Sequence, residues 1–218
     1  MSGDESEASL RLVAKSFSAV GHELAGPLQT ALNALFLLER KTAQAPPEFT
    51  TSLRTLEAAM DTLRTRLDRV LRLPQAFFVT RQDTSVDEVI DLALQPLGAD
   101  AKRVVLEVAR GRRLSIDPRG AALAVSELLA NALEAGPPGA PVSLAAGVEG
   151  HAFVARVGNG GPGFPVQAID PFFTRHARTL GLGLPVAKAV ALAHGGHLQL
   201  DDAAGTSVAT LTLPGDPA

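Results

Sequence analysis

The chain has 218 residues, of which 46% are hydrophobic and 20% charged, so it is long and apolar enough for one large folded domain or two small ones. A formal net charge of −3 excludes the basic surface that binding to a nucleic acid backbone requires, and we expect no nucleic acid partner. Because the chain contains no cysteine, disulfides, thiolate nucleophiles and zinc sites that need cysteine are also excluded.

Residues 1–74 are predicted to form an antiparallel hairpin of two long helices, interrupted at Pro46 and Pro47 because proline lacks the amide donor that continues a helix. Apolar side chains recur in both helices at alternating steps of three and four residues, the spacing of helices that pack along their length. A single hairpin cannot bury both apolar seams, so we predict a homodimer in which two hairpins form a four-helix bundle. The seam residues are Leu10, Val13, Phe17, Val20 and Leu24 in the first helix and Leu53, Leu56, Met60, Leu63, Leu67 and Val70 in the second.

Residues 75–218 are predicted to form a second domain, because short apolar runs alternate there with helical patterns. This order favours an α/β sandwich with helices on one face of a mixed sheet, which makes the whole chain α+β. The expected strands are 77–79, 104–108, 114–116, 142–148, 152–157, 197–200 and 208–213, and the expected helices are 86–97, 119–135 and 184–194.

The N-terminus is acidic where a signal peptide would be basic, and no apolar run approaches the ~18 residues that span a bilayer. We therefore expect a cytoplasmic protein that does not insert directly into a membrane.

His22 is the first candidate for chemistry, because it falls off the apolar seam of its helix and should project outward. Glu23 beside it can hydrogen-bond one ring nitrogen and raise the nucleophilicity of the other toward phosphorus. Taken alone, such a pair is more often an ordinary solvated helix surface.

Glu127 and Asn131 are four residues apart on a predicted helix, and therefore lie on one face of it. A carboxylate and an amide oxygen presented together suit a Mg²⁺ that also binds phosphate oxygens and water. The alternative is a polar edge on an amphipathic helix.

Two glycine-rich runs flank a loop of about 20 residues, which suggests a nucleotide lid. Asn159 to Gly163 follows a strand, and Leu180 to Leu184 opens a helix, where free backbone amides favour phosphate. Either run alone could be an ordinary turn.

In this order the segments resemble those of the bacterial two-component sensor histidine kinases, over nearly the whole chain. Six segments match the family's sequence boxes in the family's order, and this agreement is far more specific than any one match. They are His22 to Leu28, Glu127 to Ala132, Asn159 to Gly163, Asp170 to Thr174, Gly181 to Leu184 with His194 to Gly196 downstream, and Gly205 with Thr206.

The resemblance implies a dimerisation and histidine-phosphotransfer hairpin at 1–74 and a Bergerat-type ATP-binding domain at 75–218. The γ-phosphoryl group of ATP would pass to His22, with Glu23 as base, and then to an aspartate of a response regulator. Signals would come from a separate sensor protein. The implied nucleotide contacts are Asn131, Asn159, Gly161, Gly163, Arg175, Gly181, Leu182, Gly183, Leu184 and Thr206, with Mg²⁺ held by Asn131 and Glu127, the latter also catalytic.

The sequence departs from the family's pattern in the lid, where Thr179 and Leu180 precede Gly181 and His176 falls near a customary lysine, and at two site positions. Asn159 stands where an aspartate usually accepts from the adenine amino group, and the neutral amide should weaken ATP binding by ~1 kcal/mol. Glu127 replaces a frequent asparagine. These changes keep open the alternative of a non-enzymatic histidine phosphotransfer protein with a degenerate ATP-binding domain, and magnesium-dependent ATP binding distinguishes the two.

Overall fold

The computed structural model describes residues 24–38, 40, 47–72, 76–165, 168–169, 182–203 and 205–216. The chain separates into two compact units, Met1–Pro74 and Gln75–Ala218.

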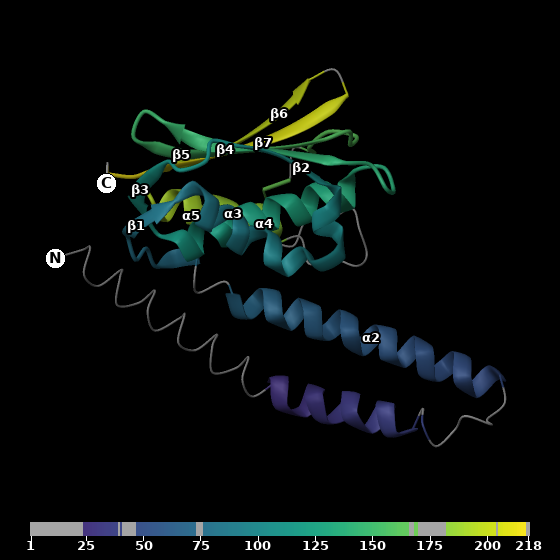
Figure 1. The fold of residues 1–218 in the computed structure, drawn as a ribbon. Coiled ribbons are helices and arrows are strands. Elements are labelled where there is room, and N and C mark those ends of the chain that lie inside the picture. The colour runs from purple at the N-terminus through teal and green to yellow at the C-terminus, as the bar shows by residue number, and fades with distance from the viewer. Residues whose placement is uncertain are drawn as a thin grey trace. The chain divides into compact units, whose positions relative to one another are not determined.

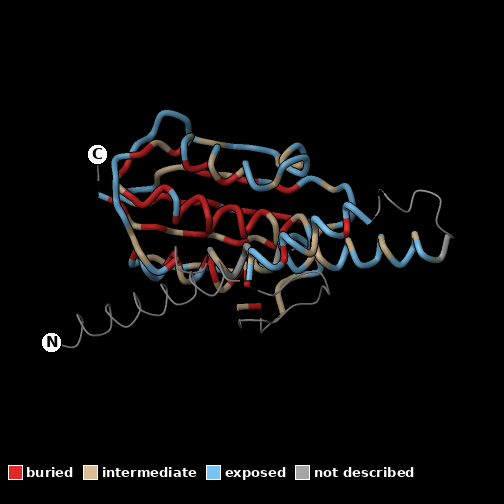
Figure 2. Tube along the Cα trace, turned by 90° about the horizontal axis from the view of Figure 1, so that it is seen from below, coloured by how far each residue is buried: buried red, intermediate tan, exposed pale blue. Residues whose placement is uncertain are grey.

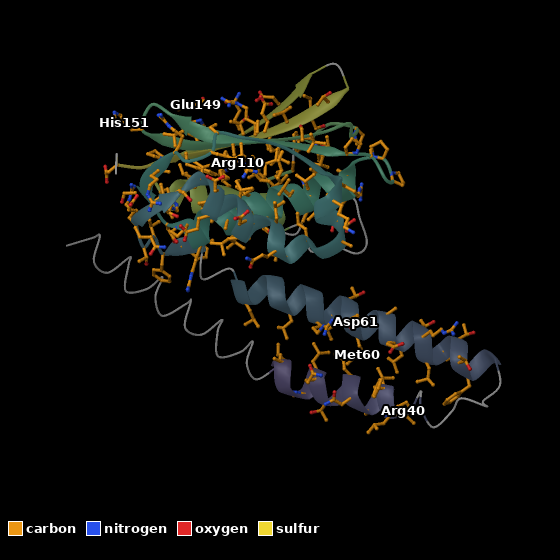
Figure 3. The ribbon with its side chains drawn as sticks, viewed as in Figure 1. Arg40, Met60, Asp61, Arg110, Glu149 and His151 are labelled. Carbon is orange, nitrogen blue, oxygen red and sulfur yellow. The ribbon has the colours of Figure 1, made fainter. Side chains whose placement is uncertain are left out.

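The described residues of the first unit are helical over 24–38 and in α2 (Pro47–Arg72). In the view of Figure 3, side chains of both helices, Met60 among them, project into the space between the two ribbons. Leu28 and Leu35 of the first helix are buried, both 7% exposed, and they are seven residues apart. This spacing is that of a helix covered along one side.

The predicted seam of α2 divides into two sets in the structure. Leu53, Met60 and Leu67 are half-buried, whereas Leu56 and Leu63 are 50% and 52% exposed within the single chain. Leu24, a predicted seam residue of the first helix, is also exposed, and the seam residues before it lie outside the described part of the chain. An apolar side therefore remains uncovered on the described helices.

The second unit is built on a mixed five-stranded sheet with the order β2-β4-β5-β7-β6 (Figure 1). β2 and β4 are parallel, and all other neighbours in this sheet are antiparallel. The short strands β1 and β3 form a separate antiparallel pair. The strands are β1 (Gln82–Ser85), β2 (Val104–Val108), β3 (Arg113–Ile116), β4 (Val142–Glu149), β5 (Ala152–Asn159), β6 (His197–Ala203) and β7 (Thr206–Pro214).

Three helices cover one face of this sheet, α3 (Val86–Leu94), α4 (Pro118–Ala135) and α5 (Gly183–Ala193). Figure 2 shows that the buried residues concentrate in these helices and in the strands. Twelve of the 18 residues of α4 are buried, many of them alanine, and small side chains allow its neighbours to approach closely. The predicted α+β class and the mixed sheet covered by helices are confirmed.

Local signals fix where two of these helices begin. The side chain of Ser85 accepts a hydrogen bond from the Glu88 amide at the start of α3, and Asp117 caps α4 in the same way through the Arg119 amide. Pro118 follows Asp117 at the first position of α4. Its lack of an N–H costs nothing there, because the first N–H groups of a helix have no partner within the helix.

Two predicted elements are wrong. Residues 77–79 are not a strand, and the segment that does pair is the polar Gln82–Ser85, which forms β1 against β3. The helix predicted for 86–97 ends earlier, because Pro96 and Gly98 follow α3 and the chain continues as the 3-10 segment η2 (Gln95–Arg103). The φ of +55° at Gly98 interrupts any continuous helix there.

Among the described residues, no helix combines the length and the apolar character needed to cross a lipid bilayer.

His194, directly after α5, is buried and only 4% exposed. Its Nδ1 lies 2.8 Å from the carbonyl oxygen of Val190, an arrangement in which Nδ1 carries the proton and donates. Its Nε2 is buried without a hydrogen-bond partner in the described part of the chain. Burial lowers the pKa of His194, the hydrogen bond to Val190 and the charge of Asp117 oppose this change, and the charge of Arg81 reinforces it.

We expect the free energy of unfolding to fall as the pH is lowered below about 6.5, the ordinary histidine pKa. The unfolded chain then takes up a proton at His194 that the folded chain does not, with a slope of at most ~1.4 kcal/mol per pH unit. Urea unfolding of wild type and His194→Gln between pH 5 and 7.5 measures this, and the variant should show the shallower dependence. The same substitution at the exposed His197 is the control. Identical profiles for wild type and His194→Gln would contradict the assignment.

Candidate functional site

The candidate site is built around the C-terminal half of α4. Glu127 is buried and Asn131 half-buried, one helical turn apart on the same face as predicted. Glu134, three residues further along this helix, is exposed, so the polar residues lie where α4 emerges from the core.

Asn159, the last residue of β5, is hydrogen-bonded to this part of α4. It is 6% exposed, and its Nδ2 donates a hydrogen bond of 3.1 Å to the carbonyl oxygen of Ala132. The same oxygen accepts from the Gly136 amide at 3.0 Å, which closes the end of the helix. Because the amide nitrogen of Asn159 must face this carbonyl, its Oδ1 is the atom left to accept from a ligand.

Gly161 lies directly against Asn159. A Cβ at this position would be 2.7 Å from the Nδ2 of Asn159 and 3.2 Å from the carbonyl oxygen of Ala135. Any side chain at 161 would therefore displace the amide group that β5 presents. The glycine here is required for close packing of the loop on the helix end.

Gly183, the first residue of α5, lies against the carboxylate of Glu127. A Cβ on Gly183 would be 3.1 Å from Oε2 of Glu127. A negative charge beside the start of a helix is stabilised by the amides and the dipole there. The structure thus brings the carboxylate predicted as a metal ligand next to the helix start predicted to favour phosphate.

The other predicted residues of this segment have different surroundings. Leu182 and Leu184 are buried in the core, at 5% and 6% exposure. Their side chains hold the start of α5 in place and face the apolar interior.

Thr206 is exposed and lines a hollow of about 300 Å³ together with Gly158, Gly160 and Ser143. The hollow lies on the side of the sheet that the helices leave uncovered. Gly158 shows this, because a Cβ on it would be 2.7 Å from the Oγ of the exposed Ser143. Ser207, the next residue, is buried and is paired with Asn159 in the register of β5 and β7. Ser207 therefore shares the face of Asn159, which the sequence alone did not indicate.

His22, Glu23, Arg175 and Gly181 lie outside the described residues, as do Asp170 to Thr174. Their predicted roles remain predictions.

The residues present fit a magnesium nucleotide. Among the residues that the structure describes, no three His, Asp or Glu side chains gather closely enough to hold a metal ion. Mg²⁺ needs no such cluster, since it is usually held by one or two protein oxygens together with phosphate oxygens and water. Asn131 and Glu127 can supply those protein oxygens.

Comparison with known proteins gives a consistent assignment. Residues 116–217 match the family described as histidine kinase-, DNA gyrase B- and HSP90-like ATPase. The chain is 35% identical over 124 residues to the signal transduction histidine-protein kinase AfsQ2 of Streptomyces coelicolor, covering 52% of this chain and 23% of that protein. It is 30% identical over 226 residues to the signal transduction histidine-protein kinase/phosphatase MprB of Mycolicibacterium vanbaalenii, covering 94% of this chain and 47% of that protein. The chain thus spans about half the length of MprB and less than a quarter of the length of AfsQ2.

A solved structure extends the likeness to the fold. Full-length ShkA, crystallised in complex with AMPPNP, matches 94% of this chain and 46% of its own with a TM-score of 0.71, at 18% identity.

Asn159→Asp should destabilise the second unit by ~1–3 kcal/mol at neutral pH. A carboxylate cannot donate a hydrogen bond to the carbonyl oxygen of Ala132. One of its oxygens would therefore face that carbonyl oxygen in the buried site, and two acceptors without a hydrogen between them repel each other. Urea unfolding of the full chain measures the change. A variant as stable as wild type would show that the amide of Asn159 is not held by Ala132.

Proposed function

Because the chain belongs to the bacterial two-component sensor histidine kinases, we propose that it transfers the γ-phosphoryl group of ATP to His22 and then to an aspartate of a response regulator. One observation supports the ATP-dependent step above the others. Asn159 at the end of β5 and Gly161 just after it pack on the C-terminal half of α4, the helix that carries Glu127 and Asn131 on one face. The proposal assigns ATP binding to residues 75–218 and phosphotransfer to residues 1–74.

In this proposal the Oδ1 of Asn159 accepts from the adenine amino group, and Gly161 and Gly163 let the backbone approach the nucleotide. Asn131 and Glu127 provide oxygens for Mg²⁺, which when bound neutralises charge on the phosphates. Arg175, Gly181 and Thr206 remain assigned to nucleotide contacts by the family resemblance alone.

The reaction at His22 is a substitution at phosphorus. One imidazole nitrogen attacks the γ-phosphorus as the bond to the oxygen that bridges the β- and γ-phosphates breaks, and ADP leaves. Glu23 takes the proton from the other ring nitrogen. In the second step the aspartate of the regulator attacks the same phosphorus and the bond to histidine breaks. Positioning and charge neutralisation are the main demands of both steps.

The chain should label itself with γ-labelled ATP and Mg²⁺, giving a product that is labile in acid and stable in alkali, as a phosphorus–nitrogen bond is. His22→Ala should abolish labelling, whereas His151→Ala, at an exposed turn, should leave it unchanged. Asn131→Ala should reduce labelling by about 10² or more, because one magnesium ligand is lost.

Undiminished labelling of His22→Ala would contradict the assignment of the phosphoacceptor.

Calorimetry with magnesium and ATP addresses the alternative function. Saturable binding supports the kinase, and no binding at millimolar nucleotide favours a phosphotransfer protein with a degenerate ATP-binding domain.

The proposal also includes a homodimer formed by the helical hairpin. Support comes from α2, where Phe49, Leu56 and Leu63 recur every seven residues and are all about half exposed in the single chain. Such a row is the pattern that a second copy would cover.

Leu56→Glu combined with Leu63→Glu should convert the dimer to a monomer, because each change places a charge in the apolar contact. Light scattering of the full chain reports the mass. The matched control is Thr51→Glu with Ala58→Glu, two exposed positions on the opposite side of α2 with the same spacing and charge. A monomeric wild type, or a dimer that survives the leucine changes, would refute this interface.

A further inference from the structure

The geometry points to Asp202 as a positioning residue that holds the glycine-rich loop at residues 160–165 in place for nucleotide binding. The effect on nucleotide rests on the function proposed above, whereas the anchoring of the loop does not. Asp202 belongs to β6, close to the turn into β7, and no part of the sequence analysis singled it out.

The register of the sheet places Asp202 in one row with the candidate site. Asp202 is paired with Ser207 across β6 and β7, and Ser207 is paired with Asn159 across β7 and β5. Residues directly opposite one another on neighbouring strands share a face of the sheet. Asn159, Ser207 and Asp202 therefore form a polar row on the side of the sheet that faces the helices, with Asn159 and Ser207 buried and Asp202 exposed at its end.

The carboxylate of Asp202 holds the far end of the loop. Its Oδ2 accepts a hydrogen bond of 2.9 Å from the backbone amide of Phe164. Gly163 adopts a φ of +89°, and a Cβ there would be 3.1 Å from the same oxygen. The left-handed backbone of Gly163 thus lies directly on the carboxylate, with no room for a side chain.

The near end of the loop is held separately, because Gly161 packs against Asn159 and the end of α4. The loop accordingly has one anchor on the helix layer and one on β6, two strands away from β5 where it begins. Removing the second anchor frees residues 162–165 while Asn159 and α4 keep their contacts. The amides of this loop are then no longer fixed where the proposed nucleotide site needs them.

The neighbouring Asp201 offers a matched control. Successive residues of a strand point to opposite faces, so its carboxylate lies on the uncovered side of the sheet. There its Oδ1 accepts only from the side chain of Gln199, at 3.0 Å, among the hydrogen bonds of the described residues. Asp201→Ala and Asp202→Ala remove the same charge from adjacent positions.

The first measurement is hydrogen–deuterium exchange of the full chain without nucleotide, followed by mass spectrometry of peptides that cover residues 160–165. Asp202→Ala should accelerate exchange at the Phe164 amide by about fivefold to tenfold, because its acceptor is lost. Asp202→Asn keeps an acceptor oxygen and should restore most of the protection. Asp201→Ala should match wild type.

The second measurement is the affinity for a fluorescent ATP analogue with Mg²⁺, together with the rate of labelling at saturating ATP. Asp202→Ala should raise the Kd by about tenfold and change the saturated rate by less than about twofold, the split expected of a residue that positions a binding loop. Asp202→Asn should recover most of the affinity.

Unchanged exchange in Asp202→Ala would overturn the inference, and so would faster exchange with unaltered affinity. A wild-type protein that binds no nucleotide, but whose loop loses protection in Asp202→Ala, would refute the proposed ATP-dependent function and the nucleotide role of Asp202 while establishing the anchor itself.

Discussion

The burial of α4 between the sheet and its neighbouring helices is the constraint on which the second unit depends. Its alanines and Gly120 let α3, α5 and the strands approach closely, and polar groups are admitted only where the surroundings stabilise them. Glu127 meets the start of α5, and the carbonyl of Ala132 meets Asn159. The end of β5 and the start of α5 are thus placed relative to each other by the contacts that each makes with α4.

Much of the fold could be predicted because it follows from local patterns of apolar and polar residues. The alternation of apolar and polar residues predicts β4 and β5 nearly to their ends, and the four-residue spacing of Glu127 and Asn131 predicts their shared face. The strand β1 could not be found in this way, since its residues Gln82–Ser85 are polar and pair only because β3 lies beside them. Ser207 and Asp202 could not be found from local patterns for a related reason, because the register of β5, β7 and β6 decides which side chains lie in one row with Asn159.

The hairpin shows a different limit of sequence patterns. One periodic row of apolar residues was predicted along α2, but the structure separates it into half-buried residues such as Met60 and exposed ones such as Leu56. Periodicity identifies which positions are apolar, and it does not say which of them the neighbouring helix of the same chain covers. That distinction depends on where the first helix packs.

The fixed amide of Asn159 has a consequence for the choice of nucleobase. A side-chain amide that could turn over would present an N–H or an oxygen with equal ease, and would suit the amino group of adenine or the carbonyl of guanine alike. Nδ2 of Asn159 donates to the carbonyl oxygen of Ala132, and Gly161 packs against the same nitrogen, so the oxygen is the atom that Asn159 leaves for a ligand. In the proposed nucleotide site, a base that brings its own carbonyl oxygen to this point would meet a second acceptor, so the uncharged end of β5 would favour adenine over guanine.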